Sequence, residues 1–278
     1  NQVAPLATDG SPSDAGVYIL LSFGYSNATQ EFCAANGIPG PLSACANWTF
    51  MGQAEADPNV RKQGLVIFNG AFSGQTNVTW DQPTDTNYAR VAANLADAGY
   101  SEAQVQIGWL KIANPQPMVA LPAPNADAYT LERSTAAVVR AMKVRYPNLK
   151  LVFISSRTYG GWANTPLNPE PYAYEGGFAV SWVVADQVRQ MAGMGTSDAG
   201  DLDYSTVAPW LAWGPYLWTD GVRGRPSDGL IWARADTAND GTHPSMSGQQ
   251  KVGALLKDFF STSEFTRCWF TVDGGSCQ

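Results

Sequence analysis

The stretch VYILLSFGYSN, from Val17 to Asn27, runs from an almost continuous apolar segment into glycine, tyrosine, serine and asparagine. A short apolar run bounded by turn residues is typical of a strand buried on both faces of a parallel sheet. The polar residues that follow Ser26 can begin a helix. Because ligands bind at the carboxyl ends of parallel strands, Ser26 is either a turn residue or a reactive serine at that edge.

The same alternation of apolar runs and helical patterns continues along the chain. The candidate strands are Val17–Ser22, Leu65–Asn69, Val105–Leu110 and Leu151–Ser155. Candidate helices carry Tyr88, Val91 and Leu95 on one face before Gly99, then Leu131, Val138 and Met142 before Pro147, then Phe178–Met191 and Gln249–Phe260. The alternation predicts a three-layer α/β/α sandwich of flavodoxin type with a central parallel sheet. We expect one domain over residues 1–278.

Composition excludes two classes of partner. The 278 residues carry a formal net charge of −7, and only 15% of them are charged. An acidic chain does not favour a nucleic-acid partner, since a phosphate backbone requires a basic face. No apolar run reaches the roughly 20 residues that a membrane helix needs. We therefore expect neither nucleic acid nor membrane as a partner.

The four cysteines indicate the compartment. The simplest of three connectivities pairs Cys33 with Cys45 and Cys268 with Cys277. A Cys/His zinc site is not expected with one histidine and no C-x-x-C spacing, so we expect no metal or cofactor. Two disulfides favour an oxidising compartment and hence a secreted protein. Since no secretion signal opens the chain, the protein is expected to be cytosolic or already processed.

Three N-x-S/T sequons, at Asn27, Asn47 and Asn77, fit a secreted glycoprotein. Asn27 directly follows Ser26, and a glycan there would block any site built on this serine. We predict that Asn27 is unmodified even if the other two asparagines carry sugar.

The only histidine, His243, lies in NDGTHPSMSGQQKV, three residues after Asp240. In a tight turn the carboxylate can accept the Nδ1–H of the imidazole and leave Nε2 free to take a proton from a serine. Ser245 can cap the helix that follows. The alternative is a surface histidine beside a loop acid. The catalytic interpretation is favoured because any histidine base must be this one.

Together these segments resemble the SGNH (GDSL-like) hydrolase superfamily, in order and over residues 17 to 260. GYSN is similar to the nucleophile block, in the form GQSN of carbohydrate acetylesterases. NGAFSGQT, from Asn69 to Thr76, is similar to the block whose glycine lines the oxyanion hole, and DGTHP matches the acid–base block. The resemblance implies Ser26 as nucleophile, His243 as base and Asp240 as its acid. It also implies oxyanion donors at the backbone N–H groups of Ser26 and Gly74.

The third block departs from the family pattern. Instead of Gly-x-Asn-Asp the chain has IGWLKIANPQP, from Ile107 to Pro117. This segment looks more like the W-x-Q-G-E variant of some acetylesterases, with Lys111 at the position of the glutamine. Lys111 is the expected side-chain donor to the oxyanion and Asn114 the alternative. The competing interpretation of Lys111 is a salt bridge to a nearby acid.

Aromatic residues and a long loop give the expectations about substrate. Trp213 and Trp218, in WLAWGPYLW, could line a cleft and stack on sugar rings, although core packing is the more common role of such residues. Arg157–Gly177 reads as a long ordered loop, and such loops are often functional. Arg157 could contact an anionic substrate such as a uronate.

The first hypothesis is a secreted serine esterase that removes acetyl or similar small acyl groups from a carbohydrate, and we expect it to be a monomer. A lipase or general carboxylester hydrolase of the same fold is the first alternative. A carbohydrate-binding protein that lost activity through its altered third block is the second. The chain has no G-x-S-x-G elbow, which opposes an α/β-hydrolase.

Overall fold

The computed structural model describes residues 3–33 and 45–275. Within them, five strands form one sheet in the order β2-β1-β3-β4-β5, and every neighbouring pair is parallel. The strands are β1 Tyr18–Gly24, β2 Leu65–Asn69, β3 Val105–Lys111, β4 Leu151–Ile154 and β5 Trp210–Trp213. The four predicted strands are confirmed to within two residues at either end. β5 was not predicted, because its aromatic residues suggested a cleft lining.

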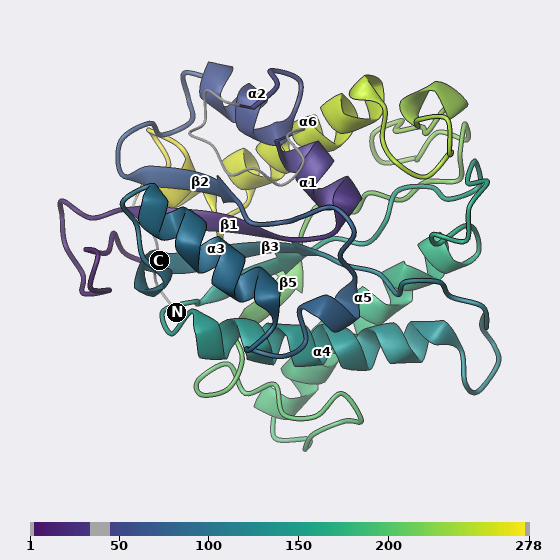
Figure 1. Cartoon of the computed structure of the whole chain (residues 1–278), viewed down its shortest axis with the longest axis horizontal. Helices are drawn as coiled ribbons and strands as arrows, with labels where there is room; N and C mark the ends of the chain where they lie inside the picture. The colour runs from purple at the N-terminus through teal and green to yellow at the C-terminus, as the bar shows by residue number, and fades with distance from the viewer. Residues whose placement is uncertain (1–2, 34–44, 276–278) are drawn as a thin grey trace.

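Helices cover both faces of the sheet (Figure 1). The helices are α1 Ser26–Phe32, α2 Phe50–Ala56, α3 Thr86–Asp97, α4 Asp127–Arg145, α5 Tyr172–Met191, α6 Met246–Thr262 and α7 Arg267–Phe270. Figure 1 shows α1, α2 and α6 on one side of the strands and α3, α4 and α5 on the other. The predicted three-layer α/β/α sandwich is confirmed.

The strands are apolar throughout because each faces two cores. Ile19 and Leu21 of β1 join the core beneath α3, α4 and α5, whereas Leu20 joins the core beneath α1, α2 and α6. Aromatic rings fill the second core, where Phe32 stacks on Trp109 of β3 with ring centroids 5.5 Å apart. Packing on both faces fixes where each strand ends, and thus where the side chains of the following turn lie.

Two local signals at helix ends have the predicted effect, and the predicted end of one loop is wrong. Gly99 follows α3 with φ +83°, the left-handed conformation that ends many helices. Ser245 caps α6 by accepting the Gly248 N–H at 3.5 Å. The predicted loop Arg157–Gly177 is shorter than expected, since α5 already begins at Tyr172.

A disulfide joins Cys33 and Cys45, as predicted. Cys277, half of the second predicted pair, lies outside the described residues. None of the helices within 3–33 and 45–275 combines the length and the apolar character needed to span a bilayer.

Candidate active site

Segments that follow four neighbouring strands meet at the carboxyl edge of the sheet. Ser26 comes after β1, Gly74 after β2, Asn114 after β3 and Arg157 after β4, and all four line one cavity of about 370 Å³. His243 lines the same cavity from the loop before α6. The parallel sheet thus collects residues that lie far apart in the sequence.

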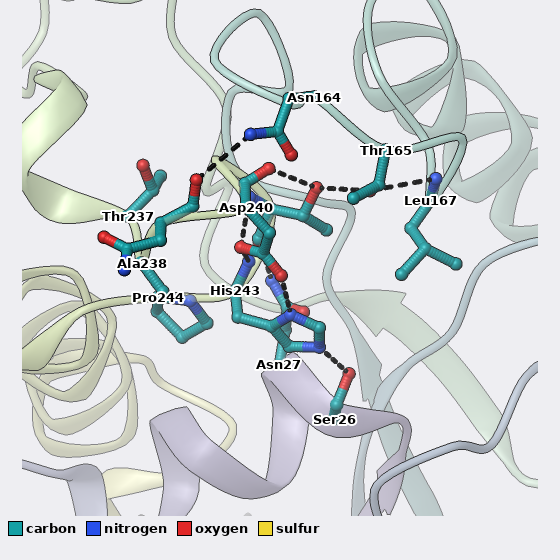
Figure 2. A network of polar contacts seen from close by, with 12 residues as sticks. Ser26, Asn27, Asn164, Thr165, Leu167, Thr237, Ala238, Asp240, His243 and Pro244 are labelled. Carbon is teal, nitrogen blue, oxygen red and sulfur yellow. Dashed lines mark hydrogen bonds and ion pairs between the residues drawn. The ribbon is translucent and has the colours of Figure 1, made fainter.

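Ser26, His243 and Asp240 form a continuous chain of hydrogen bonds (Figure 2). The Ser26 Oγ lies 2.8 Å from Nε2 of His243, although the two residues are 217 positions apart. On the other side of the ring, Nδ1 lies 2.5 Å from Oδ2 of Asp240. When the imidazole proton is on Nδ1, that N–H donates a hydrogen bond to the Asp240 carboxylate. Nε2 can then accept a hydrogen bond from the Ser26 hydroxyl.

The Asp240–His243 turn is held by its own backbone. Oδ1 of Asp240 accepts the N–H groups of Thr242 and His243, each at 3.0 Å. Gly241 has φ +68°, and an added Cβ would overlap the carbonyl oxygen of Trp162, so the position requires glycine. Partial burial acts to raise the pKa of Asp240, but the hydrogen bonds from His243 and Thr242 outweigh it and lower that pKa below its ordinary value. Asp240 is therefore a stable anion behind the ring.

The loop after β4 supports this turn from behind (Figure 2). The backbone N–H of Asn164 donates to the Asp240 carbonyl at 3.0 Å, and its side-chain amide donates to the Asn239 carbonyl at 3.1 Å. The Thr165 and Thr242 hydroxyls lie 3.0 Å apart. These contacts fix the acid and the imidazole relative to the sheet.

Asn27 connects the serine helix to the histidine loop, a role that sequence reasoning missed. Its side chain is buried, and Nδ2 donates to the Thr242 carbonyl at 2.9 Å. In the sequence, Asn27 was recognisable only as part of a sequon. Burial of this amide agrees with the prediction that Asn27 carries no glycan. Asn77 is likewise buried, whereas Asn47 is exposed.

Two backbone N–H groups are available beside Ser26 for a developing negative charge. Ser26 is the first residue of α1, where an N–H has no partner within its helix. Gly74 lines the cavity with φ +77°. Among the described residues, neither N–H has a hydrogen-bond acceptor.

The structure differs from the expectation for Lys111. Its side chain is completely buried, and Nζ donates to both carboxylate oxygens of Glu31 at 2.6 Å. Lys111 does not line the cavity, so the salt-bridge alternative describes its environment. Burial raises the pKa of Glu31 and lowers that of Lys111, against the mutual attraction of the pair.

Asn114, the alternative third-block residue, lines the cavity. Its Oδ1 accepts from Nδ2 of Asn77 at 2.8 Å, and its own Nδ2 donates to the Asp127 carbonyl at 2.8 Å. These two contacts orient the amide and leave one of its two N–H bonds unused by them. Asn77, which orients this amide, is a second residue that the sequence analysis treated only as a sequon.

The predicted substrate-contacting residues separate into two groups. Arg157 lines the cavity, but Trp213 and Trp218 do not. Trp213 packs against the core beneath α5, and Trp218 donates its indole N–H to Glu170 at 2.8 Å. The core-packing interpretation describes Trp213, and Trp218 helps to hold the loop before α5.

The fold and the site define an α/β/α protein with a serine, an imidazole and a carboxylate aligned at the carboxyl edge of its sheet. No protein-family model and no curated protein matches the chain. Solved structures with a similar fold include a GDSL-like lipase and an acetylxylan esterase.

A putative GDSL-like lipase from Parabacteroides merdae is 11% identical, with a TM-score of 0.44, over 88% of this chain and 98% of the other. A catalytic mutant of the acetylxylan esterase Axe2 from Geobacillus stearothermophilus is 14% identical, with a TM-score of 0.44, over 87% and 92%. The salicylyl-acyltransferase SsfX3 is 14% identical, with a TM-score of 0.41; 87% of this chain aligns and spans 53% of that protein. Since these overlaps are loose, residue roles are assigned from the geometry of this chain.

Proposed function

We propose that the chain is a serine ester hydrolase that removes acetyl or similarly small acyl groups from a carbohydrate. The observation that carries the proposal is the Ser26–His243–Asp240 chain of hydrogen bonds, which opens into the cavity. A serine hydroxyl is a weak nucleophile until a base accepts its proton, and Nε2 of His243 is at the required distance.

Acylation follows from this alignment. The Ser26 Oγ attacks the ester carbonyl carbon while its proton passes to Nε2 of His243. The imidazolium is stabilised by the carboxylate of Asp240. When the tetrahedral intermediate collapses, the proton moves from Nε2 to the leaving alcohol oxygen, and the acyl group stays on Ser26. Water then attacks the acyl-serine with the same histidine as base, and the carboxylic acid and the free serine are released.

The oxyanion of each tetrahedral intermediate would lie among the N–H groups of Ser26, Gly74 and Asn114. Removing one such donor costs about 10²–10³ in kcat in a well-characterised serine protease. Asn114 supplies a neutral amide where Lys111 would have supplied a charge. The buried pair of Lys111 with Glu31 instead packs α1 against β3.

Cavity size and chemistry support a small acyl group on a polar alcohol. The cavity measures about 370 Å³. The accessible lining is mostly apolar, but several of its residues carry an amide or a hydroxyl: Gln30, Ser73, Gln75, Thr76, Asn114, Gln116 and Asn168. Such groups can hydrogen-bond to the hydroxyls of a sugar. The disulfide between Cys33 and Cys45 agrees with a secreted enzyme.

The test compares wild type with Ser26→Ala on p-nitrophenyl acetate, longer p-nitrophenyl esters and an acetylated sugar. Loss of a triad serine can lower kcat by about 10⁶. Ser227→Ala is the control because it removes an exposed serine hydroxyl that does not line the cavity, and it should keep wild-type activity. Equal rates for wild type and Ser26→Ala would end the proposal, and faster hydrolysis of long acyl chains would indicate a lipase.

A further inference from the structure

One charged side chain in the cavity has no ion-pair partner among the described residues. The Arg157 side chain lines the cavity and is only 5% exposed, yet no carboxylate in 3–33 or 45–275 forms an ion pair with it, and its Nε has no hydrogen-bond acceptor. Its contact is the ring of Tyr25, whose centroid lies 5.4 Å from the guanidinium carbon. A guanidinium has five N–H donors and remains charged at any physiological pH, so burying it without an acceptor is costly.

The acids around Arg157 are already engaged. Glu31 is the carboxylate whose charge reaches both Lys111 and Arg157, but its two oxygens each accept a hydrogen bond from Lys111 at 2.6 Å. Asp240 is occupied by His243 and by two backbone N–H groups. Glu31 and Lys111 neutralise each other, and among the described residues Arg157 is the one permanently charged side chain that lines the cavity.

A second unpartnered donor lies beside the guanidinium. The Tyr25 hydroxyl is buried and has no hydrogen-bond partner among the described residues, as is also true of Nε of Arg157. Burial raises the pKa of Tyr25 to about 12, even though Arg157 acts to lower it, so the hydroxyl keeps its proton as a donor. Tyr25 directly precedes Ser26 in the chain, and Tyr25, Arg157 and Ser26 line the same cavity.

We propose that Arg157 binds a carboxylate on the ester substrate, so that the preferred substrate is an acidic sugar ester. This inference rests on the proposed function and narrows its substrate class. The planar guanidinium matches a planar carboxylate through paired N–H···O bonds. Since Arg157 contacts the ring of the residue before Ser26, the carboxylate lies within about one sugar unit of the attacked carbonyl. It belongs either to a uronate ring that bears the ester or to the acyl group itself.

The recognition is local rather than long-range. The whole chain carries a net charge of −7 and does not attract a polyanion from solution. A buried guanidinium is screened little by salt, so the preference for acidic substrates should persist at high ionic strength. A preference that disappears in salt would instead indicate a surface effect.

The first test uses substrate pairs that differ only in charge. An acetylated methyl galacturonoside is compared with the equivalent galactoside, and p-nitrophenyl hemisuccinate with p-nitrophenyl acetate. The sugar pair tests a uronate carboxylate, and the aryl pair tests an acyl carboxylate. Wild type should have a higher kcat/KM for the acidic member of at least one pair. In Arg157→Met the acidic-to-neutral ratio of kcat/KM should fall about ten- to a hundredfold, the usual effect of losing a hydrogen bond to a charged group.

Arg157→Lys should keep part of the ratio, because it retains the charge but not the paired geometry. Arg133→Met, on the exposed side of α4, is the control and should leave the ratio unchanged. An unchanged ratio in Arg157→Met would overturn the proposal. Equal losses on acidic and neutral substrates would also overturn it, since Arg157 would then act on the reacting carbonyl or on the fold.

A binding measurement separates this inference from the proposed function. Galacturonate, succinate and galactose are titrated calorimetrically into Ser26→Ala, and hydrolysis is not required. Galacturonate or succinate should bind more tightly than galactose, and adding Arg157→Met should remove the difference. Equal binding of the acidic and neutral ligands would refute the role of Arg157 even if Ser26 proves to be the nucleophile. If the wild type hydrolyses no ester but the protein still binds galacturonate more tightly than galactose, the proposed function is wrong and the anion site remains.

Discussion

Replacing Lys111 by methionine should destabilise the protein strongly, because it leaves Glu31 buried without its partner. Both side chains are fully inaccessible, and Lys111 occupies both carboxylate oxygens. Removing one member of a buried pair typically costs about 3–5 kcal/mol of unfolding free energy. Replacing both with apolar side chains is often neutral or stabilising, so Lys111→Met with Glu31→Met should recover most of the loss.

The loss should depend on pH in a defined direction. Burial raises the pKa of Glu31, and without Lys111 nothing comparable opposes that rise. In Lys111→Met the folded carboxyl therefore binds its proton more tightly than the unfolded one. The variant keeps this stability below the unfolded pKa of about 4.3 and loses about 1.4 kcal/mol per pH unit as the pH rises toward the folded pKa.

Urea unfolding followed by tryptophan fluorescence at pH 5 and pH 8 measures both effects. The stability gap between wild type and Lys111→Met should be wider at pH 8. Two results would refute the pairing argument. One is a loss of unfolding free energy under about 1 kcal/mol for Lys111→Met at pH 8. The other is a double variant whose loss equals the sum of the losses of the two single variants. Activity adds a separate readout. If Lys111 were an oxyanion donor, the double variant would lose about 10²–10³ in kcat, whereas a packing role predicts retained activity.

Three further predictions follow from the site and from the surface. Asp240→Asn should lower kcat by about 10⁴ in an ester assay, because an amide no longer selects the productive tautomer, and unchanged KM would localise the defect to chemistry. Gly241→Ala should lose activity and thermal stability together, since the new Cβ overlaps the Trp162 carbonyl; Gly193→Ala has the same sign of φ but open space, and should lose only about 1–2 kcal/mol of stability with activity intact. Burial, a hydrogen bond to Asp186 and the charge of Asp186 raise the pKa of Glu132 from 4.5 to about 7, so the protonated form stabilises the fold at low pH and this contribution disappears as the pH rises through about 7. Melting curves should show Glu132→Gln with a smaller drop between pH 5 and pH 8 than wild type, and the exposed Glu264→Gln should not differ from wild type in this respect.

The sheet could be predicted to the extent that its strands are buried on both faces. Four strands have apolar runs that match no helical period, and they were located nearly to the residue. β5 has only four residues, two of them tryptophan, and such a pattern fits a strand, a core turn or a cleft wall equally well. Which of these forms depends on β4 as its neighbour, a long-range fact that local sequence does not contain.

The proposed site shows a similar division. The serine and the Asp–x–x–His turn could be placed because the parallel sheet brings segments that follow its strands to one edge. The pairing of Lys111 could not be read from its own block, because its partner lies on α1. A signal did exist: Glu31 falls between Ala28 and Phe32 on the buried side of that helix, and a carboxylate there requires a buried cation.

The 217-residue separation between the serine and its imidazole partner has a consequence for how the molecule matures. Neither half of the polypeptide contains both members of the proposed relay, so the proposed hydrolysis can begin only after the amino-terminal strand and the carboxyl-terminal helix have docked on the same sheet. When the protein refolds after dilution from denaturant, the return of ester hydrolysis would then report only molecules whose sheet is fully assembled. Circular dichroism would also detect helices in partly assembled molecules.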